Sequence, residues 1–98
     1  MMEYIKLYWE HNFDDEPIVI FYEVCVEAER LAKRSIDVYA NGETKNVDDL
    51  YEGVIEITPI PTIEEFNSGV WGEEFFASLV TKEKFESVWI NKAKSIKV

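Results

Sequence analysis

The sequence predicts an α+β fold, an antiparallel β-sheet of four to five strands with one main C-terminal α-helix packed on it. Three observations predict it: early segments rich in β-forming residues, an Asn41-Gly42 pair between strand-like segments, and an apolar helical stripe near the C-terminus. A short helix is also expected near residues 62–67. With 98 residues, 47% of them hydrophobic, the chain is expected to form a single domain, 1–98, with its own core.

The first part of the chain predicts three strands. Tyr4–Trp9 has the two-residue period of a half-buried strand. Ile18–Val24 is apolar except for Glu23, which indicates a strand covered on both faces. A turn near Glu27–Glu29 and a third strand at Arg30–Ala40 are favoured over a helix at Glu27–Lys33, where the apolar residues also fit helical spacing.

Asn41-Gly42 is the strongest turn signal in the sequence. Both residue types tolerate the positive φ that a type I′ hairpin turn requires at its two central positions. A fourth strand is therefore expected from Glu43 to Val47, antiparallel to the third, with Asp48-Asp49 at its end. A further short strand is expected at Val54–Ile57, which is rich in β-forming residues.

The second part of the chain predicts two helices. Thr62 and Glu65 form a capping-box pattern for a short helix that Asn67-Ser68-Gly69 ends. Residues 73–80 fit either a short strand or an extended arm. Thr81 is a good N-cap for the C-terminal helix. The apolar face of that helix consists of Phe85, Val88, Trp89, Ala93 and Ile96, and three lysines lie near its C-terminal end, Lys92, Lys94 and Lys97.

No motif indicates catalysis, so we expect a protein that is not an enzyme and holds neither metal nor cofactor. The single histidine, His11, is expected to be a loop residue oriented by Asn12 or Asp14. A pocket around His11 with convergent carboxylates would instead favour an enzyme. The single cysteine, Cys25, lies in an apolar run and is expected to be a small buried hydrophobic residue.

Acidity is the main indication of function. The net charge of −10 disfavours nucleic acids and anionic membranes and favours a basic protein partner. Residues 43–74 contain nine acids and one lysine, a net charge of −8, whereas residues 82–98 contain five lysines and two glutamates, a net charge of +3. The predicted partner-binding residues are Asp48, Asp49, Tyr51, Glu52, Glu56, Glu64, Glu65, Trp71, Glu73 and Glu74.

Two alternatives stay open for this acidic stretch. Its acids either bind a partner or form a plain solvated face, and Trp71 lies either in an exposed loop or folded back on the sheet. The N-terminus has no basic region followed by a long apolar stretch, so we expect a cytoplasmic protein. We also expect the protein to be monomeric when it is not bound to its partner.

Short motifs along the chain carry a resemblance to a known family. Near the N-terminus stand Tyr4-Ile5-Lys6-Leu7-x-Trp9-x-His11, Asp15-x-Pro17 and Tyr22-Glu23, followed by Arg30, Arg34, Ile36-Asp37-Val38-Tyr39 and Asn41-Gly42. Later come Pro59-x-Pro61, Ile63-Glu64-Glu65-Phe66-Asn67 and Thr81-Lys82-Glu83-x-Phe85-Glu86-x-Val88-Trp89. With these motifs the chain resembles a family of small uncharacterised bacterial domains, a resemblance that implies no particular activity.

In kind, the chain is also similar to immunity proteins of bacterial toxin systems, including contact-dependent inhibition. Those proteins are small, cytoplasmic and often acidic, and each binds one basic nuclease toxin. We therefore expect a binding protein that neutralises a basic toxin domain, a nuclease, by occluding its active face with acidic residues. The alternative is a non-toxin interaction or regulatory module of unknown partner.

Overall fold

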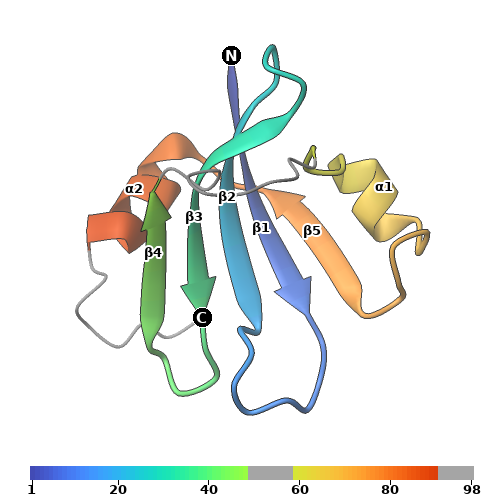
Figure 1. Ribbon diagram of the computed structural model, residues 1–98, viewed down its shortest axis with the longest axis vertical. Coiled ribbons are helices and arrows are strands. Elements are labelled where there is room, and N and C mark those ends of the chain that lie inside the picture. The colour runs from blue at the N-terminus through green and yellow to red at the C-terminus, as the bar shows by residue number, and fades with distance from the viewer. Residues whose placement is uncertain (49–58, 91–98) are drawn as a thin grey trace.

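One antiparallel sheet organises the part of the chain that the computed structural model describes, residues 1–48 and 59–90. The strand order is β4-β3-β2-β1-β5 (Figure 1). The elements are β1 (Met2–Trp9), β2 (Val19–Cys25), β3 (Leu31–Val38), β4 (Thr44–Asp48), α1 (Ile63–Asn67), β5 (Phe75–Leu79) and α2 (Lys82–Ile90). The α+β prediction is therefore confirmed.

The predicted strands of the first half are confirmed with bounds that differ by at most two residues. For the stretch 73–80, the strand alternative is confirmed and the extended arm is not. This stretch contains the edge strand β5, which pairs antiparallel with β1. The strand expected at Val54–Ile57 lies outside the described residues, as do the helix positions Ala93 and Ile96.

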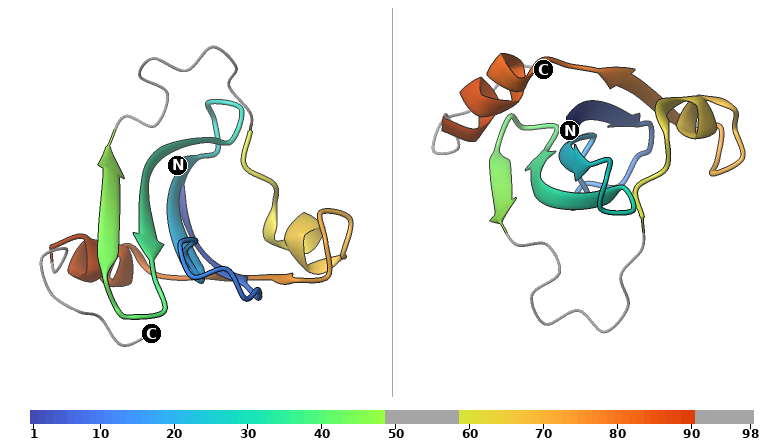
Figure 2. Two further views of the ribbon diagram at one scale, coloured as in Figure 1. Left: turned by 60° about the horizontal axis from the view of Figure 1, so that its bottom comes forward. Right: turned by 90° about the horizontal axis from the view of Figure 1, so that it is seen from above.

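Both faces of the sheet are covered, each by one helix. Helix α2 packs on one face and α1 on the other, and Figures 1 and 2 show the two helices at opposite flanks of the sheet. The core under α2 consists of Tyr4, Val19, Phe21, Ile36, Val38, Phe85 and Val88. The core on the side of α1 consists of Ile5, Leu7, Val24, Phe66 and Ala77.

The two cores confirm that both faces of the second strand are covered. The first strand alternates as predicted from Ile5 to Tyr8 and departs from the half-buried pattern only at Tyr4. Tyr4 and Ile5 are neighbours on β1, so their side chains point to opposite faces, yet both are buried. The reason is that α2 covers the face that carries Tyr4, which the sequence pattern assigned to solvent, whereas α1 covers the face that carries Ile5, which the pattern assigned to the core.

Both predicted helix starts are confirmed. The Thr62 side chain accepts from the Glu65 N–H at 3.1 Å, and the Glu65 carboxylate accepts from the Thr62 N–H at 3.0 Å, which completes the capping box. The Thr81 hydroxyl accepts from the Lys84 N–H at 3.0 Å and caps α2. In the described ranges, neither helix has the length and apolar character needed to cross a lipid bilayer.

The β3–β4 connection differs from the predicted type I′ turn. Only Gly42 has a positive φ, +87°, whereas a type I′ turn requires it at both central residues. The Gly42 N–H donates to the Tyr39 carbonyl, the Tyr39 N–H donates to the Glu43 carbonyl, and the Asn41 side chain accepts from the Glu43 N–H. The hairpin is therefore one residue longer than predicted, because Asn41 bonds its own backbone instead of adopting the left-handed conformation.

The β2–β3 turn spans residues 26–30, which confirms the predicted turn over the helix alternative. Glu29 and Arg30 both have positive φ, 58° and 57°, a conformation that costs about 1–2 kcal/mol per residue for L-amino acids. The Arg30 side chain donates to the carbonyls of Ile60 and Pro61 and to the Glu3 carboxylate. These bonds hold the segment that precedes α1 against the β2–β3 turn.

The outer edge of β5 is closed by a side chain. The Asn67 amide donates to the Ala77 carbonyl at 2.9 Å and accepts from the Ala77 N–H at 2.7 Å. Asn67 thus takes the place that a neighbouring strand would occupy, and it satisfies backbone groups that an edge strand leaves open. It also fixes α1 beside β5.

A polar cluster lies beneath α2. Arg34 of β3 donates through Nε and Nη2 to the two carboxylate oxygens of Glu23 on β2, each at 2.7 Å, and through Nη2 to Glu86 of α2. The Tyr4 hydroxyl donates to Glu23 at 3.0 Å. The cluster therefore joins three strands to the helix.

The protonation states of this cluster follow from these contacts. Hydrogen bonds from Arg34 hold the pKa of the Glu23 carboxyl below its usual value. Burial, with the bond to Glu23, raises the pKa of Tyr4 to about 12. At neutral pH, Glu23 is therefore ionised and the Tyr4 hydroxyl keeps its proton.

Candidate protein-binding site

The structure places only half of the predicted site residues. Asp49, Tyr51, Glu52 and Glu56 lie outside the described residues, and so does the side chain of Asp48, the last residue of β4. The remaining predicted residues fall into two places, one on α1 (Glu64 and Glu65) and one in the α1–β5 connection (Trp71, Glu73 and Glu74).

These two places are not one surface. Glu65 is held by the capping box, and its bonds to Thr62, with the nearby Arg30 charge, lower the pKa of its carboxyl. Glu64 and Glu65 therefore lie near the β2–β3 turn, where Arg30 contacts the start of α1. Glu74 instead lies at the opposite end of the sheet, where its carbonyl accepts from the Glu10 N–H at 2.9 Å.

The acids gather at the end of the sheet where β1 leads into β2 and β3 leads into β4. Because β5 runs antiparallel to β1 and begins there, the α1–β5 connection lies at the same end. The connections involved are residues 10–18, 39–43 and 72–74, which contain neither lysine nor arginine. Their carboxylates, all exposed, are Glu10, Asp14, Asp15, Glu16, Glu43, Glu73 and Glu74, and we call this set the acidic end.

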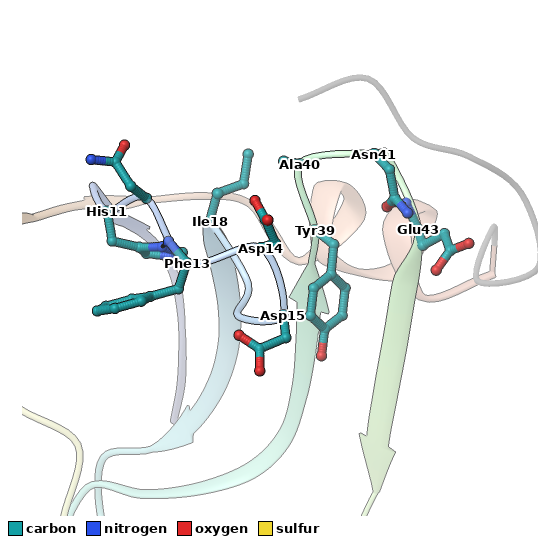
Figure 3. Close-up of a pocket in the computed structure, with 10 residues that line it drawn as sticks. His11, Phe13, Asp14, Asp15, Ile18, Tyr39, Ala40, Asn41 and Glu43 are labelled. Carbon is teal, nitrogen blue, oxygen red and sulfur yellow. Dashed lines mark hydrogen bonds between the residues drawn. The ribbon is translucent and has the colours of Figure 1, made fainter.

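A hollow of about 640 Å³ lies within the acidic end, between the β1–β2 and β3–β4 connections. Figure 3 shows Asp14 and Asp15 on one side of the hollow, Glu43 on the other and the ring of Tyr39 between them. Within the described part of the chain, no ion pair joins these three carboxylates to a lysine or arginine. The hollow, called the acidic hollow below, thus presents negative charge that the described residues leave uncompensated.

Two titratable groups beside the hollow respond to this charge. Burial raises the pKa of the Tyr39 hydroxyl, and the carboxylates of Asp37, Glu16 and Asp15 raise it further. Burial also raises the pKa of the Asp37 carboxyl, against the opposing effect of Lys45 and with a contribution from Glu16. The charges of the β1–β2 connection therefore reach across to β3.

His11 lines the acidic hollow, and a histidine among carboxylates is the arrangement that would favour an enzyme. Its Nε2 lies 2.7 Å from the Pro17 carbonyl, and its Nδ1 accepts from the Phe13 N–H at 2.9 Å. Both ring nitrogens are thus engaged by the backbone of the same connection, so neither is left as a base or a ligand. The expected loop histidine with local hydrogen bonds is confirmed, although backbone groups of Phe13 and Pro17, and not the side chains of Asn12 or Asp14, orient the ring.

Among residues 1–48 and 59–90, no three His, Cys, Asp or Glu side chains come together in a way that could hold a metal ion. Cys25, expected to be buried, is partly exposed at the end of β2. The reason is its position at the sheet's margin, beside the turn that begins at residue 26.

Trp71 combines the two alternatives that the sequence left open. Its side chain is 54% exposed, and at the same time it lines an apolar groove on the face of the sheet that carries α1. Trp71 therefore lies in an exposed loop, and its side chain also contributes to the wall of this groove on the sheet.

Sequence reasoning missed the acids of the β1–β2 connection. Asp14, Asp15 and Glu16 are all absent from the predicted set of partner-binding residues. The signal was available, because in four strands joined in order as antiparallel neighbours the first and third connections lie at the same end. The order of the four predicted strands alone could therefore have placed residues 10–18 and 39–43 at the same end of the sheet.

Comparison with known proteins identifies a family whose function is not known. A family model described as "Domain of unknown function (DUF6881)" matches residues 3–94, which agrees with the expected resemblance to a family of small uncharacterised domains. No curated protein and no solved structure matches the chain. The match carries no link to immunity proteins, so that likeness stays a prediction.

Proposed function

The chain belongs to the DUF6881 family of domains of unknown function, and from this premise we propose that it is a binding protein for a basic protein partner. In its most concrete form, the protein is a cytoplasmic immunity protein that neutralises a basic toxin domain, a nuclease. The acidic end is the contact surface. The observation that carries the proposal is the set of exposed carboxylates at one end of the sheet, in connections without any lysine or arginine.

The mechanism is occlusion by charge complementarity. A nuclease holds nucleic-acid phosphates with lysine and arginine side chains, and carboxylates at the acidic end take the place of those phosphates. Carboxylates grip guanidinium groups through paired hydrogen bonds, and Asp14, Asp15 and Glu43 line a hollow open to such a group. The net charge of −10 also steers a basic partner toward the protein and raises the association rate by roughly 10–10³.

A second function is favoured by a different observation. Val70, Trp71, Phe76 and Leu79 are large apolar side chains that are more than half exposed. Such side chains suit a non-toxin interaction or regulatory module whose contacts are mainly apolar. In that case, the acidic end only keeps the protein solvated, and binding of the partner depends little on salt.

The test uses the protein encoded by the neighbouring gene as the candidate partner. Its binding to the wild-type protein is measured by calorimetry at low and high salt, together with inhibition of its nuclease activity. The variant Asp14→Asn/Asp15→Asn/Glu43→Gln is expected to bind at least tenfold more weakly, about 1.4 kcal/mol, and to show a smaller salt dependence.

The matched control carries the same charge change away from the hollow. Glu29→Gln/Glu64→Gln/Glu83→Gln also removes three exposed carboxylates, from the β2–β3 turn and the two helices. It is expected to keep binding close to that of the wild-type protein. Equal weakening by both triple variants would show that only net charge matters, and binding that resists salt would favour the second function.

A further inference from the structure

An apolar groove of about 370 Å³ lies on the α1 side of the sheet. The described residues that line it include no charged side chain; among them are Trp9, Tyr22, Pro61, Trp71 and Phe75. The groove remains open to solvent at Trp71, of which 54% is exposed. Open aromatic surface next to a packed core is the kind of site that takes up a large apolar side chain of a partner.

The groove adjoins the acidic hollow through a run of neighbouring aromatic rings. The ring of Trp9 lines the groove, and its centroid lies 4.2 Å from that of His11 and 6.3 Å from that of Phe13, both of which line the hollow. Trp9 also stacks on Phe75 in the groove, at 6.1 Å. A ligand that crosses Trp9 therefore passes from an apolar surface to an acidic one.

Charge decides which occupant fits. A second copy of this chain would bring another net charge of −10 to the acidic end, so the field opposes self-association. A segment that carries lysine or arginine is attracted instead. The exposed Glu10 and Glu74, joined backbone to backbone, are the sequence neighbours of Trp9 and Phe75, so they bring negative charge to the end of the sheet where these two groove residues lie.

We propose that the groove is the anchor site for a segment of the basic partner. This segment carries one large apolar side chain, aromatic or aliphatic, and a lysine or arginine close to it in sequence. The apolar side chain enters the groove beside Trp71, and the basic side chain enters the acidic hollow. The inference rests on the proposed function, since it takes from it the basic character of the partner.

The two parts of the surface have different roles in recognition. Exposed carboxylates raise the association rate with basic proteins and exclude acidic ones. The groove admits only segments whose apolar side chain stands at the right distance from the charge, so it selects among basic partners.

The test selects short random peptides displayed on phage against the wild-type protein. We expect the enriched sequences to share one large apolar residue near a lysine or arginine. The most enriched peptide is then synthesised and its affinity measured by fluorescence anisotropy. Trp71→Ala is expected to weaken binding at least tenfold. Val70→Ala, which alters the neighbouring and 72% exposed side chain outside the groove, is expected to leave it unchanged.

A second measurement needs no protein variant. Replacing the apolar residue of the peptide by serine is expected to weaken binding as much as Trp71→Ala, so the test holds even if that variant proves unstable in a thermal melt. Binding of the serine peptide at the affinity of the parent peptide overturns the inference, as does a selection that enriches no apolar residue or no motif.

The outcomes separate this inference from the proposed function. Enrichment of basic peptides that Asp14→Asn/Asp15→Asn/Glu43→Gln weakens and Trp71→Ala does not would overturn the anchor and leave the basic partner standing. Enrichment of apolar peptides without lysine or arginine, bound equally at low and high salt, would count against the basic partner itself.

Discussion

The guanidinium of Arg34 lies 4.7 Å from the centre of the Trp89 ring and so links the middle of β3 to the last turn of α2. The same guanidinium lies 4.9 Å from the centre of the Phe85 ring. It also pairs with Glu23 at its other edge. One side chain thus connects a buried carboxylate to two aromatic rings of the helix, which makes it the main polar contact that positions α2.

Replacing Arg34 should destabilise the fold strongly. Arg34→Leu leaves the ionised Glu23, only 6% exposed, without its cationic partner, and it removes the contacts to both rings. Breaking a buried ion pair on one side costs about 3 kcal/mol or more. We expect the free energy of unfolding, measured by urea denaturation, to fall by about that amount.

Lys33→Leu is the matched control, because it makes the same substitution at the next position of β3 on an exposed side chain. Its effect on the free energy of unfolding should stay within about 0.5 kcal/mol. Arg34→Lys keeps the charge but loses the forked hydrogen bonds, so an intermediate loss is expected. Equal stability of Arg34→Leu and Lys33→Leu would show that the cluster does not hold α2.

Acidic pH should remove the contribution of Glu23 to the stability of the folded protein. Its pKa in the folded protein is lowered below the value of 4.5 for the free side chain, mainly by hydrogen bonds from Arg34. The stability that it contributes is therefore present above pH 4.5 and is lost as the pH falls through the lowered pKa of the folded state. We expect Glu23→Gln to be less stable than the wild-type protein at neutral pH, with a difference that shrinks in acid.

Comparing the two proteins at each pH isolates this residue, because all other carboxylates are present in both. The same comparison in the Arg34→Leu background is the control. There, the main cause of the lowered pKa is absent while burial, which raises it, remains. The difference should then lose its acid dependence or reverse it, and a difference that still shrinks in acid would contradict the assigned cause.

The field of the acidic end should be measurable at Tyr39. Asp15→Asn/Glu16→Gln removes two of the carboxylates that raise the pKa of the Tyr39 hydroxyl, so that pKa should fall toward its ordinary value of 10.0. Added salt should lower it in the wild-type protein as well, because it screens exposed charges. The measurement is an NMR titration of ¹³C-labelled tyrosine rings, with the Tyr39 signal assigned through Tyr39→Phe.

Glu64→Gln/Glu83→Gln is the control for this titration, since it removes two exposed carboxylates from the helices and leaves the β1–β2 connection intact. It should leave the pKa of Tyr39 unchanged. If Asp15→Asn/Glu16→Gln also left that pKa unchanged, the acidic end would not act as one field, and the proposed contact surface would lose its electrostatic support.

Several local features were predictable because neighbours in the chain determine them. The capping box at Thr62 and Glu65 and the cap at Thr81 depend on residues three positions apart. The hairpin position at Asn41-Gly42 was also predictable, although its turn type was not. The choice between turn types depends on the backbone conformation of Asn41, whose side chain can either favour positive φ or bond to Glu43, as it does here.

The polar cluster under α2 was not predictable from spacing. Glu23 was visible as one acid inside an apolar strand, a position that requires a partner when buried. Its partners are Tyr4 of β1 and Arg34 of β3, and Arg34 in turn bonds to Glu86 of α2; nothing in the chain order says which cation will lie opposite Glu23. The strand register and the docking of α2 decide it.

By itself, the sequence determined that this protein is a strongly acidic α+β domain without a recognisable catalytic motif, because composition and local periodicity depend only on which residues are neighbours. Only the tertiary structure decided which of the acidic side chains lie together. It separates Glu64 and Glu65 from Glu73 and Glu74, which are close in the chain. It brings Glu43 and Glu74 to the same end of the sheet as Asp14 and Asp15, because antiparallel pairing places distant connections side by side and leaves their charges to add.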